Sequence, residues 1–128
     1  MKLAAEELRG YFQDVTVHGA IAVGTNGLAG VIAAKAKYTV FVQKIIITVT
    51  TDAAQTFTAQ DTNGTPKVIA EAAANPGEGQ LIFEWGDEGE PLTEGKGLDF
   101  VQSAAGLGYN YDVYAYRRAT STLIPSEL

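Results

Sequence analysis

The chain has 128 residues, of which 46% are hydrophobic, and it carries a net charge of −6 and no cysteine. This size and apolar content suit one domain with its own core, and the lack of cysteine excludes disulfides, zinc–thiolate sites and thiol catalysis. Eight acids and one base lie between Glu71 and Asp99, and the rest of the chain is nearly neutral. Because no basic patch appears, nucleic-acid binding is not expected.

Residues 1–13 are expected to form either a short helix or an extended arm, and Gly10 weakens the helix. Two early glutamates and the lack of an apolar run argue against a secretory signal here. The longest apolar-rich stretch in the chain is broken by polar residues and is shorter than the roughly 20 residues that span a bilayer, so no membrane partner is expected. The apolar residues of the arm have loosely helical spacing and are Leu3, Leu8, Tyr11 and Phe12.

From Asp14 onward, alternating apolar residues and turn-forming glycines predict about eight short strands. The Asn63-Gly64 step is the strongest hairpin signal. Because no long helix separates the strands, the sequence predicts an all-β fold, a small β-sandwich or jelly roll over residues 14–118 with a tail over 119–128. The expected strands are 14–23, 28–34, 38–51, 55–61, 67–73, 80–85, 97–103 and 107–118.

The strand expected over Tyr38–Thr51 is unusually long and carries apolar residues on both faces. Its length predicts a bend or bulge near Gln43 and Lys44. Apolar residues on both faces indicate that both are partly covered, by the core or by a partner. One face carries Tyr38, Val40, Val42 and Ile46, and the other carries Phe41, Ile45, Ile47 and Val49.

The last expected strand has a core row from Tyr109 to Ala115 and an opposite face with Tyr114, Tyr116 and Arg118. Tyrosine and arginine are enriched at protein interfaces, which favours a binding role for this second face. The alternative is that the N-terminal arm covers it.

No catalytic or metal centre is expected. The single histidine, His18, cannot supply a triad or a histidine cluster and is interpreted as structural. The acidic Gly86–Pro91 loop is interpreted as solvated, with weak calcium binding as a minor alternative. The glycine-rich stretch after Val23 lacks the lysine of a phosphate-binding loop. Trp85 shares a face with Leu81 and Phe83 and is more typical of a core residue than of a sugar platform.

The order of these features resembles the small head-decoration (capsid-stabilising) proteins of tailed bacteriophages. The resemblance covers roughly residues 15–118 and carries over no catalytic residue. Its elements are His18-Gly19-Ala20-Ile21-Ala22, Val31-Ile32-Ala33-Ala34, the strand from Lys37 to Thr51, Pro76-Gly77-Glu78-Gly79, Phe83-Glu84-Trp85, Thr93-Glu94-Gly95-Lys96-Gly97-Leu98 and the closing tyrosine-rich strand.

The resemblance implies a protein made in the host cytoplasm that coats the virion's capsid, binds the major capsid protein and stabilises the shell, often as a trimer. No cofactor and no enzymatic activity are expected, because the residues themselves offer no catalytic or metal centre. The chain departs from the shortest members by its N- and C-terminal tails. A carbohydrate-binding β-sandwich, suggested by Trp85 and the tyrosines of the last strand, is the alternative. The expected interface residues are Leu3, Leu8, Tyr11, Phe12, Tyr38, Val40, Val42, Tyr114, Tyr116 and Arg118.

Overall fold

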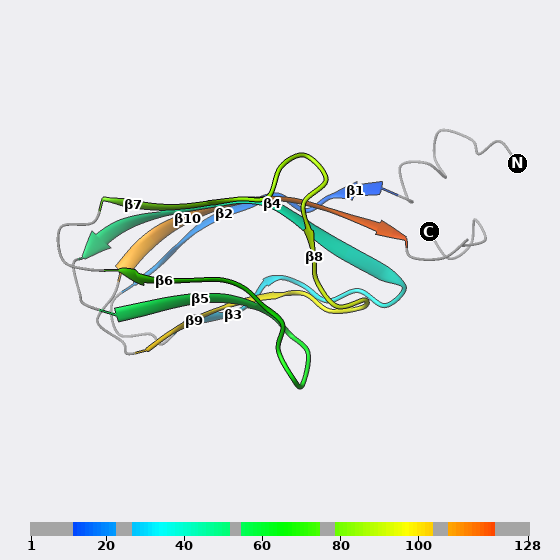
Figure 1. Cartoon of the computed structure of the whole chain (residues 1–128), viewed down its shortest axis with the longest axis horizontal. Helices are drawn as coiled ribbons and strands as arrows, with labels where there is room; N and C mark the ends of the chain where they lie inside the picture. The colour runs from blue at the N-terminus through cyan, green and yellow to red at the C-terminus, as the bar shows by residue number, and fades with distance from the viewer. Residues whose placement is uncertain (1–11, 23–26, 52–54, 75–78, 104–107, 120–128) are drawn as a thin grey trace, which may run out of the picture.

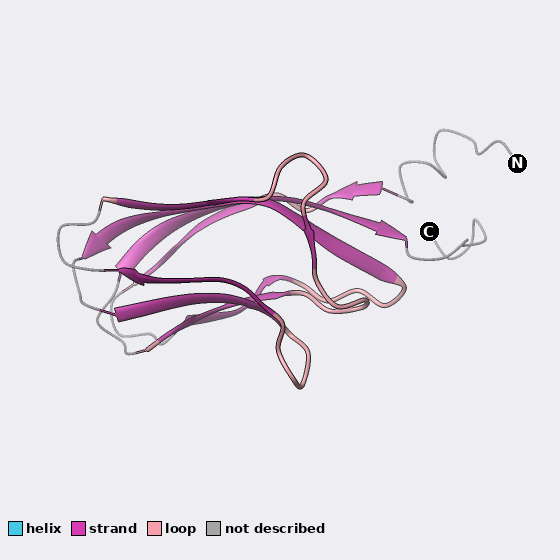
Figure 2. Cartoon of the chain, viewed as in Figure 1, coloured by secondary structure: helices cyan, strands magenta, loops and turns pink. Residues whose placement is uncertain are grey.

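The computed structural model describes residues 12–22, 27–51, 55–74, 79–103 and 108–119, which form ten β-strands and no helix (Figures 1 and 2). The predicted all-β fold is therefore confirmed, and no helix in these residues is long and apolar enough to cross a membrane. The strands are β1 (Phe12–Asp14), β2 (Val17–Ile21), β3 (Gly27–Ile32), β4 (Tyr38–Thr51), β5 (Gln55–Asp61), β6 (Val68–Ala74), β7 (Gln80–Glu84), β8 (Glu90–Pro91), β9 (Leu98–Gln102) and β10 (Gly108–Ala119).

Two antiparallel sheets face each other (Figure 1). In sheet A, β10 and β4 are the central strands; β1 and β2 pair one after the other with the outer edge of β10, and β7 and β8 do the same with β4. Sheet B has the order β3-β9-β5-β6. Each sheet thus has four rows, and the ten strands make the eight rows predicted from the sequence.

The row order is that of a jelly roll. Numbered along the chain, sheet A contains the first, eighth, third and sixth rows, and sheet B contains the second, seventh, fourth and fifth. Successive rows cross from one sheet to the other except at the β5–β6 hairpin, which holds the predicted Asn63-Gly64 step. Two interlocked Greek keys of this kind define the jelly-roll family of sandwiches.

The core fills the space between the sheets. Ile45 and Ile47 of sheet A and Phe57 of sheet B have no exposed surface, and the Phe57 ring lies 5.7 Å from that of Tyr109. The Tyr109 hydroxyl donates to the Gln102 side chain over 3.2 Å, and burial raises the pKa of Tyr109 well above its usual range. Alternate residues of every long strand supply this core, because successive side chains of a strand point to opposite faces.

A β-bulge in β4 changes which residues face the core. Tyr114 of β10 pairs with Lys44, but the next residue, Ala115, pairs with Val42, so Gln43 is the extra residue. The bulge predicted near Gln43 and Lys44 is therefore confirmed. Before the bulge the even residues of β4 point inward, and after it the odd residues do.

The bulge in β4 lies beside interruptions in two other rows of sheet A. We call the residues at these positions, Thr16, Gln43, Asp87 and Ala115, the bulge line. The first row is interrupted between β1 and β2, where the Val15 amide donates to the Ala115 carbonyl over 3.1 Å. The sixth row is interrupted between β7 and β8, where the Gln43 side chain donates to the Asp87 carbonyl over 2.7 Å. The bulge line divides the outer face of sheet A into two halves.

Asp61 links the β5–β6 loop to the segment between β8 and β9 through hydrogen bonds. This role was not predicted from the sequence. Its fully buried carboxylate accepts bonds from the backbone amides of Asn63, Lys67 and Thr93 and from the Thr93 hydroxyl. Burial alone would raise the pKa of Asp61, but these hydrogen bonds outweigh it and hold the pKa below its ordinary value of 3.8. The segment also reaches sheet A, because the Leu92 amide donates to the Val40 carbonyl over 2.9 Å.

Candidate binding face

The outer face of sheet A brings together four of the residues expected at an interface. Tyr114, Tyr116 and Arg118 alternate along β10 with the buried row Tyr109–Ala115, so they point away from the core. Phe12 of β1 lies directly opposite Arg118 and is 50% exposed. The two-sided character that the sequence indicated for the last strand is thus confirmed.

Three side chains stack on one another at the β1 end of this face. The rings of Phe41 and Tyr116 lie parallel, 5.1 Å apart, and the Arg118 guanidinium lies 4.8 Å above the Phe41 ring. The Tyr116 hydroxyl donates to the Glu88 carbonyl over 2.8 Å, which fixes the ring against the β7–β8 loop. We call Phe12, Phe41, Tyr116 and Arg118 the aromatic cluster; its parallel rings and cation–π contact make it a preorganised surface.

The other half of the face, beyond the bulge line, is more polar. His18 and Asp112 lie opposite each other with Nδ1 and Oδ1 2.6 Å apart, and the Tyr114 ring packs edge-on against His18. Lys44 and Glu84 form an exposed ion pair at 3.4 Å. His18 is therefore a paired surface residue of β2.

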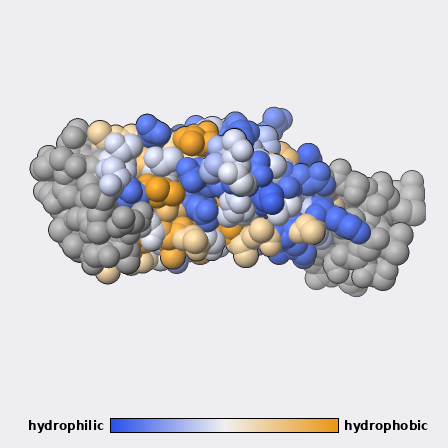
Figure 3. Space-filling view, turned by 90° about the horizontal axis from the view of Figure 1, so that it is seen from below, coloured by the Kyte–Doolittle hydropathy of each residue, from blue (hydrophilic) through white to orange (hydrophobic). Residues whose placement is uncertain are grey.

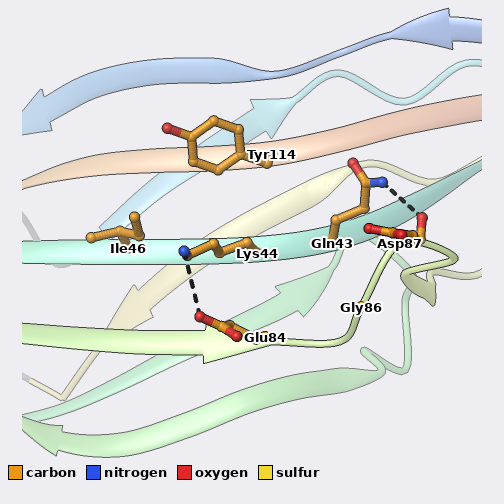
Figure 4. Close-up of a pocket in the computed structure, with 7 residues that line it drawn as sticks. All are labelled: Gln43, Lys44, Ile46, Glu84, Gly86, Asp87 and Tyr114. Carbon is orange, nitrogen blue, oxygen red and sulfur yellow. Dashed lines mark hydrogen bonds and ion pairs between the residues drawn. The ribbon is translucent and has the colours of Figure 1, made fainter.

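Two shallow hollows meet at Gln43. One, of about 410 Å³, lies on the polar half and is drawn in Figure 4. In that view Tyr114 comes from β10, the ion-paired Lys44 comes from β4, and Glu84 comes from the end of β7. The second hollow, of about 540 Å³, borders the aromatic cluster. Its lining residues are Phe12, Gln13, Asp14, Thr16, Gln43, Ala115 and Tyr116.

Three residues expected at an interface lie in the interior instead. Tyr38 and Val40 are 2% exposed and Val42 is fully buried, so the expectation that this face of β4 meets a partner is wrong for the folded chain. The reason is the bulge at Gln43, which turns these even residues inward and leaves Phe41 on the outer face. Phe41 was not expected at the interface, because the sequence predicts a bulge near Gln43 but not its effect on which residues of β4 face outward.

The remaining expectations concern the arm and Trp85. Leu3, Leu8 and Tyr11 lie outside the described residues. Phe12–Asp14 forms a strand of sheet A and starts just before the expected domain boundary. Trp85 packs half-buried against the core and stacks on Phe83 at 6.4 Å, as the core interpretation predicted.

Several acidic side chains of the described residues are engaged in ion pairs or hydrogen bonds. Among the described residues, no three histidine or acidic side chains gather where they could hold a metal ion. Glu90, expected in the acidic loop, lies instead in β8, where it pairs with Val42 of β4, and its side chain forms an ion pair with Lys67 at 3.0 Å. On the outer face, the pKa of Asp14 is lowered by hydrogen bonds from Thr16, chiefly from its backbone amide. That carboxylate caps the break between β1 and β2.

Comparison with known proteins identifies no family. No protein-family model matches the chain, and no curated protein sequence matches it. The chain is similar in structure to one in the structure of infectious bursal disease virus, Gt strain, at 10% sequence identity and a TM-score of 0.31. The match covers 82% of this chain and 30% of that viral chain. A TM-score of this size does not establish a common fold, so the jelly-roll assignment rests on the strand order.

Proposed function

We propose that the chain is a structural virion protein whose sheet A face binds the outside of a phage capsid and stabilises the shell. The observation that carries this proposal is the convergence of the aromatic cluster on one exposed end of sheet A. Aromatic and arginine side chains supply most of the binding energy at protein interfaces, and they do so best when they are held rigidly.

The shape of this face suits a protein partner better than a small substrate. Both hollows are shallow openings on a sheet, and the rings of the aromatic cluster present their area to the outside. A small-molecule site normally surrounds its ligand, whereas a protein interface needs a broad surface with a few rigid anchors. The proposal assigns no catalytic residue and no cofactor.

The resemblance and the architecture support the proposed partner and assembly. Jelly rolls are a common architecture of viral capsid domains, and the strand order of this chain is of that kind. We assign the major capsid protein as the partner, a trimer as the assembled form, the host cytoplasm as the place of synthesis and the capsid surface as the final location.

Co-sedimentation with purified capsid shells of the encoding phage tests this function. Phe41→Ala and Arg118→Ala should each weaken shell binding about tenfold or more, because each removes an anchor of the aromatic cluster. Thr58→Ala, on the outer face of sheet B, is the matched control and should leave binding unchanged. Shells that bind none of these proteins, or bind all of them equally, would contradict the proposal.

Light scattering tests the trimer. The mass should correspond to three chains in solution or, if assembly is completed by the shell, to three copies at each local threefold position in a reconstruction of decorated shells. Single copies both in solution and on the shell would contradict the trimer while leaving shell binding to be judged by co-sedimentation.

One observation favours a carbohydrate-binding module as the second candidate. The hollow of Figure 4 combines the exposed Tyr114 with the amide of Gln43 and the carboxylate of Glu84, the kinds of group that stack on sugar rings and hydrogen-bond their hydroxyls. On a glycan array, Tyr114→Ala should abolish such binding and Tyr116→Ala should not. A silent array with the wild-type chain would remove this candidate.

A further inference from the structure

Two cationic side chains, Lys35 and Arg117, contact the same side-chain oxygen of Gln13 at the β1 end of sheet A. The Arg117 Nε lies 2.6 Å from the Gln13 Oε1, and the Lys35 Nζ lies 3.5 Å from that same atom. Both cations also lie against the Tyr38 ring, at 4.5 Å for Lys35 and 5.5 Å for Arg117. All of these groups are half-buried or buried.

The strand pairing produces this arrangement. Gln13 of β1 lies directly opposite Arg117 of β10, and both alternate with outward-facing neighbours. Lys35 comes from the turn before β4, where the Tyr38 amide donates to the Lys35 carbonyl over 3.3 Å. Figure 3, seen from the sheet B side, shows hydrophilic residues gathered toward this end of the molecule and hydrophobic patches nearer the other end.

The positive charge of this site has no carboxylate to balance it in the described part of the chain. The ion pairs there join His18 to Asp112, Lys44 to Glu84 and Lys67 to Glu90, and none involves Lys35 or Arg117. The Asp14 carboxylate, next to Gln13, bonds the Thr16 amide instead. Two like charges that share only a neutral acceptor repel each other, and a carboxylate placed between them would attract both.

We propose that Lys35 and Arg117 form an anion site that receives a carboxylate from an acidic segment of a partner protein. The guanidinium offers paired donors that match a carboxylate, the ammonium adds a point charge, and the Tyr38 ring forms one wall. The Gln13 amide can turn to donate its NH2 group to the same anion. This inference goes beyond the proposed function, since it holds for any partner with such a segment.

Supplying the carboxylate within the chain is the first test. Gln13→Glu places an anion where both cations already point, so the melting temperature should rise by about 3 °C or more. The matched control is Gln80→Glu on β7, where the side chain bonds only Thr48 among the described residues and no such rise is expected. A Gln13→Glu chain that melts no higher than the wild type would overturn the proposal.

Direct binding is the second test, with a hexaglutamate peptide and inorganic phosphate as separate probes at low salt. Calorimetry should detect the peptide with the wild-type chain and a loss of affinity of about tenfold with Lys35→Gln, Arg117→Gln and Gln13→Glu. Arg117→Lys is the control that retains the positive charge at this position. Circular dichroism checks that each variant folds. Phosphate binding without peptide binding, or no binding of either probe, would overturn the proposal.

These outcomes are separable from those of the proposed function. Phe41→Ala leaves Lys35 and Arg117 untouched, so it should bind the peptide like the wild type even if it fails to bind shells. If the Lys35→Gln and Arg117→Gln variants bind shells normally, the shell is not the acidic partner. Loss of peptide binding by the same variants would still identify the anion site.

Discussion

The two outer faces of the sandwich differ more than the two inner ones. The inner faces of both sheets supply the same kind of side chain, as Ile47 and Phe57 illustrate. The outer face of sheet A carries stacked rings, an arginine and ion pairs, whereas that of sheet B carries Thr58 and Gln60 with the scattered apolar residues Val68 and Val101. We infer that both sheets hold the fold together and that sheet A is the side adapted for binding.

Both sheets have register shifts, and the one in sheet A lies beside the aromatic cluster. The bulge line of sheet A interrupts two rows and shifts the register of β4 against β10 at Gln43. That shift places Phe41 beside Tyr116 on the outer surface instead of in the core. Bulges re-aim side chains in this way and are common beside functional surfaces.

The largest predicted effects on stability come from core substitutions, which test whether the inner faces of the two sheets contribute equally to the core. Phe57→Ala in sheet B and Ile45→Ala in sheet A should each lower the free energy of unfolding by about 3–4 kcal/mol, because each empties a fully buried position. Urea denaturation measures both. A loss under about 1 kcal/mol from either sheet would mean that this sheet contributes little to the core.

The next largest loss of stability is expected at Asp61, a buried carboxylate of sheet B; sheet A has no buried carboxylate among its described residues. Asp61→Ala should cost about 3 kcal/mol at neutral pH, since it leaves several buried donors without their charged acceptor. Because its folded pKa lies below 3.8, the stabilisation is complete above that value and is lost as the pH falls through the lowered pKa.

Acid titration therefore separates Asp61 from the rest of the chain. The stability of the wild type should fall more steeply between about pH 4 and pH 2 than that of Asp61→Asn. Parallel curves for the two proteins would contradict the role assigned to this carboxylate.

The aromatic cluster should matter little to folding. Phe41→Ala should cost about 1 kcal/mol of stability, the loss of a half-exposed stacked pair, and Thr58→Ala on the opposite face should stay within about 0.5 kcal/mol of the wild type. Thermal melts compare them. A loss of several kcal/mol from Phe41→Ala would make the cluster a structural element and weaken its assignment as a binding surface.

The smallest effect is expected at the Lys44–Glu84 pair. Both side chains are well exposed, so Lys44→Gln should change the free energy of unfolding by less than about 0.5 kcal/mol. Denaturation at low and high salt measures how much this ion pair contributes to the free energy of unfolding. A large loss that high salt does not reduce would indicate a packing role for the Lys44 side chain.

Much of the fold could be predicted from local patterns. Alternation located β4 and β5 with their observed bounds, and the Asn63-Gly64 step located the β5–β6 hairpin. Strand order could not be derived in this way, because pairings such as β10 with β2 join residues that are far apart in the sequence. Only the general sandwich or jelly-roll class was open to prediction.

The candidate site was partly predictable for a similar reason. The two-sided pattern of β10 identified Tyr114, Tyr116 and Arg118 as surface residues. Val42 was misjudged because the inward face of β4 depends on the position of one extra residue opposite β10. Asp61 and Lys35 were missed because tertiary structure supplies their partners, Thr93 for Asp61 and Gln13 for Lys35. No local spacing marks either pair.

Hydroxyl-radical footprinting of the chain bound to capsid shells tests most directly whether sheet A is the binding side. The predicted result is protection of Phe12 and Tyr116 relative to the unbound chain, while Val68 and Val101 on sheet B keep their reactivity. Protection of Val68 and Val101 with unchanged reactivity at Phe12 and Tyr116 would contradict the account and assign binding to the other face.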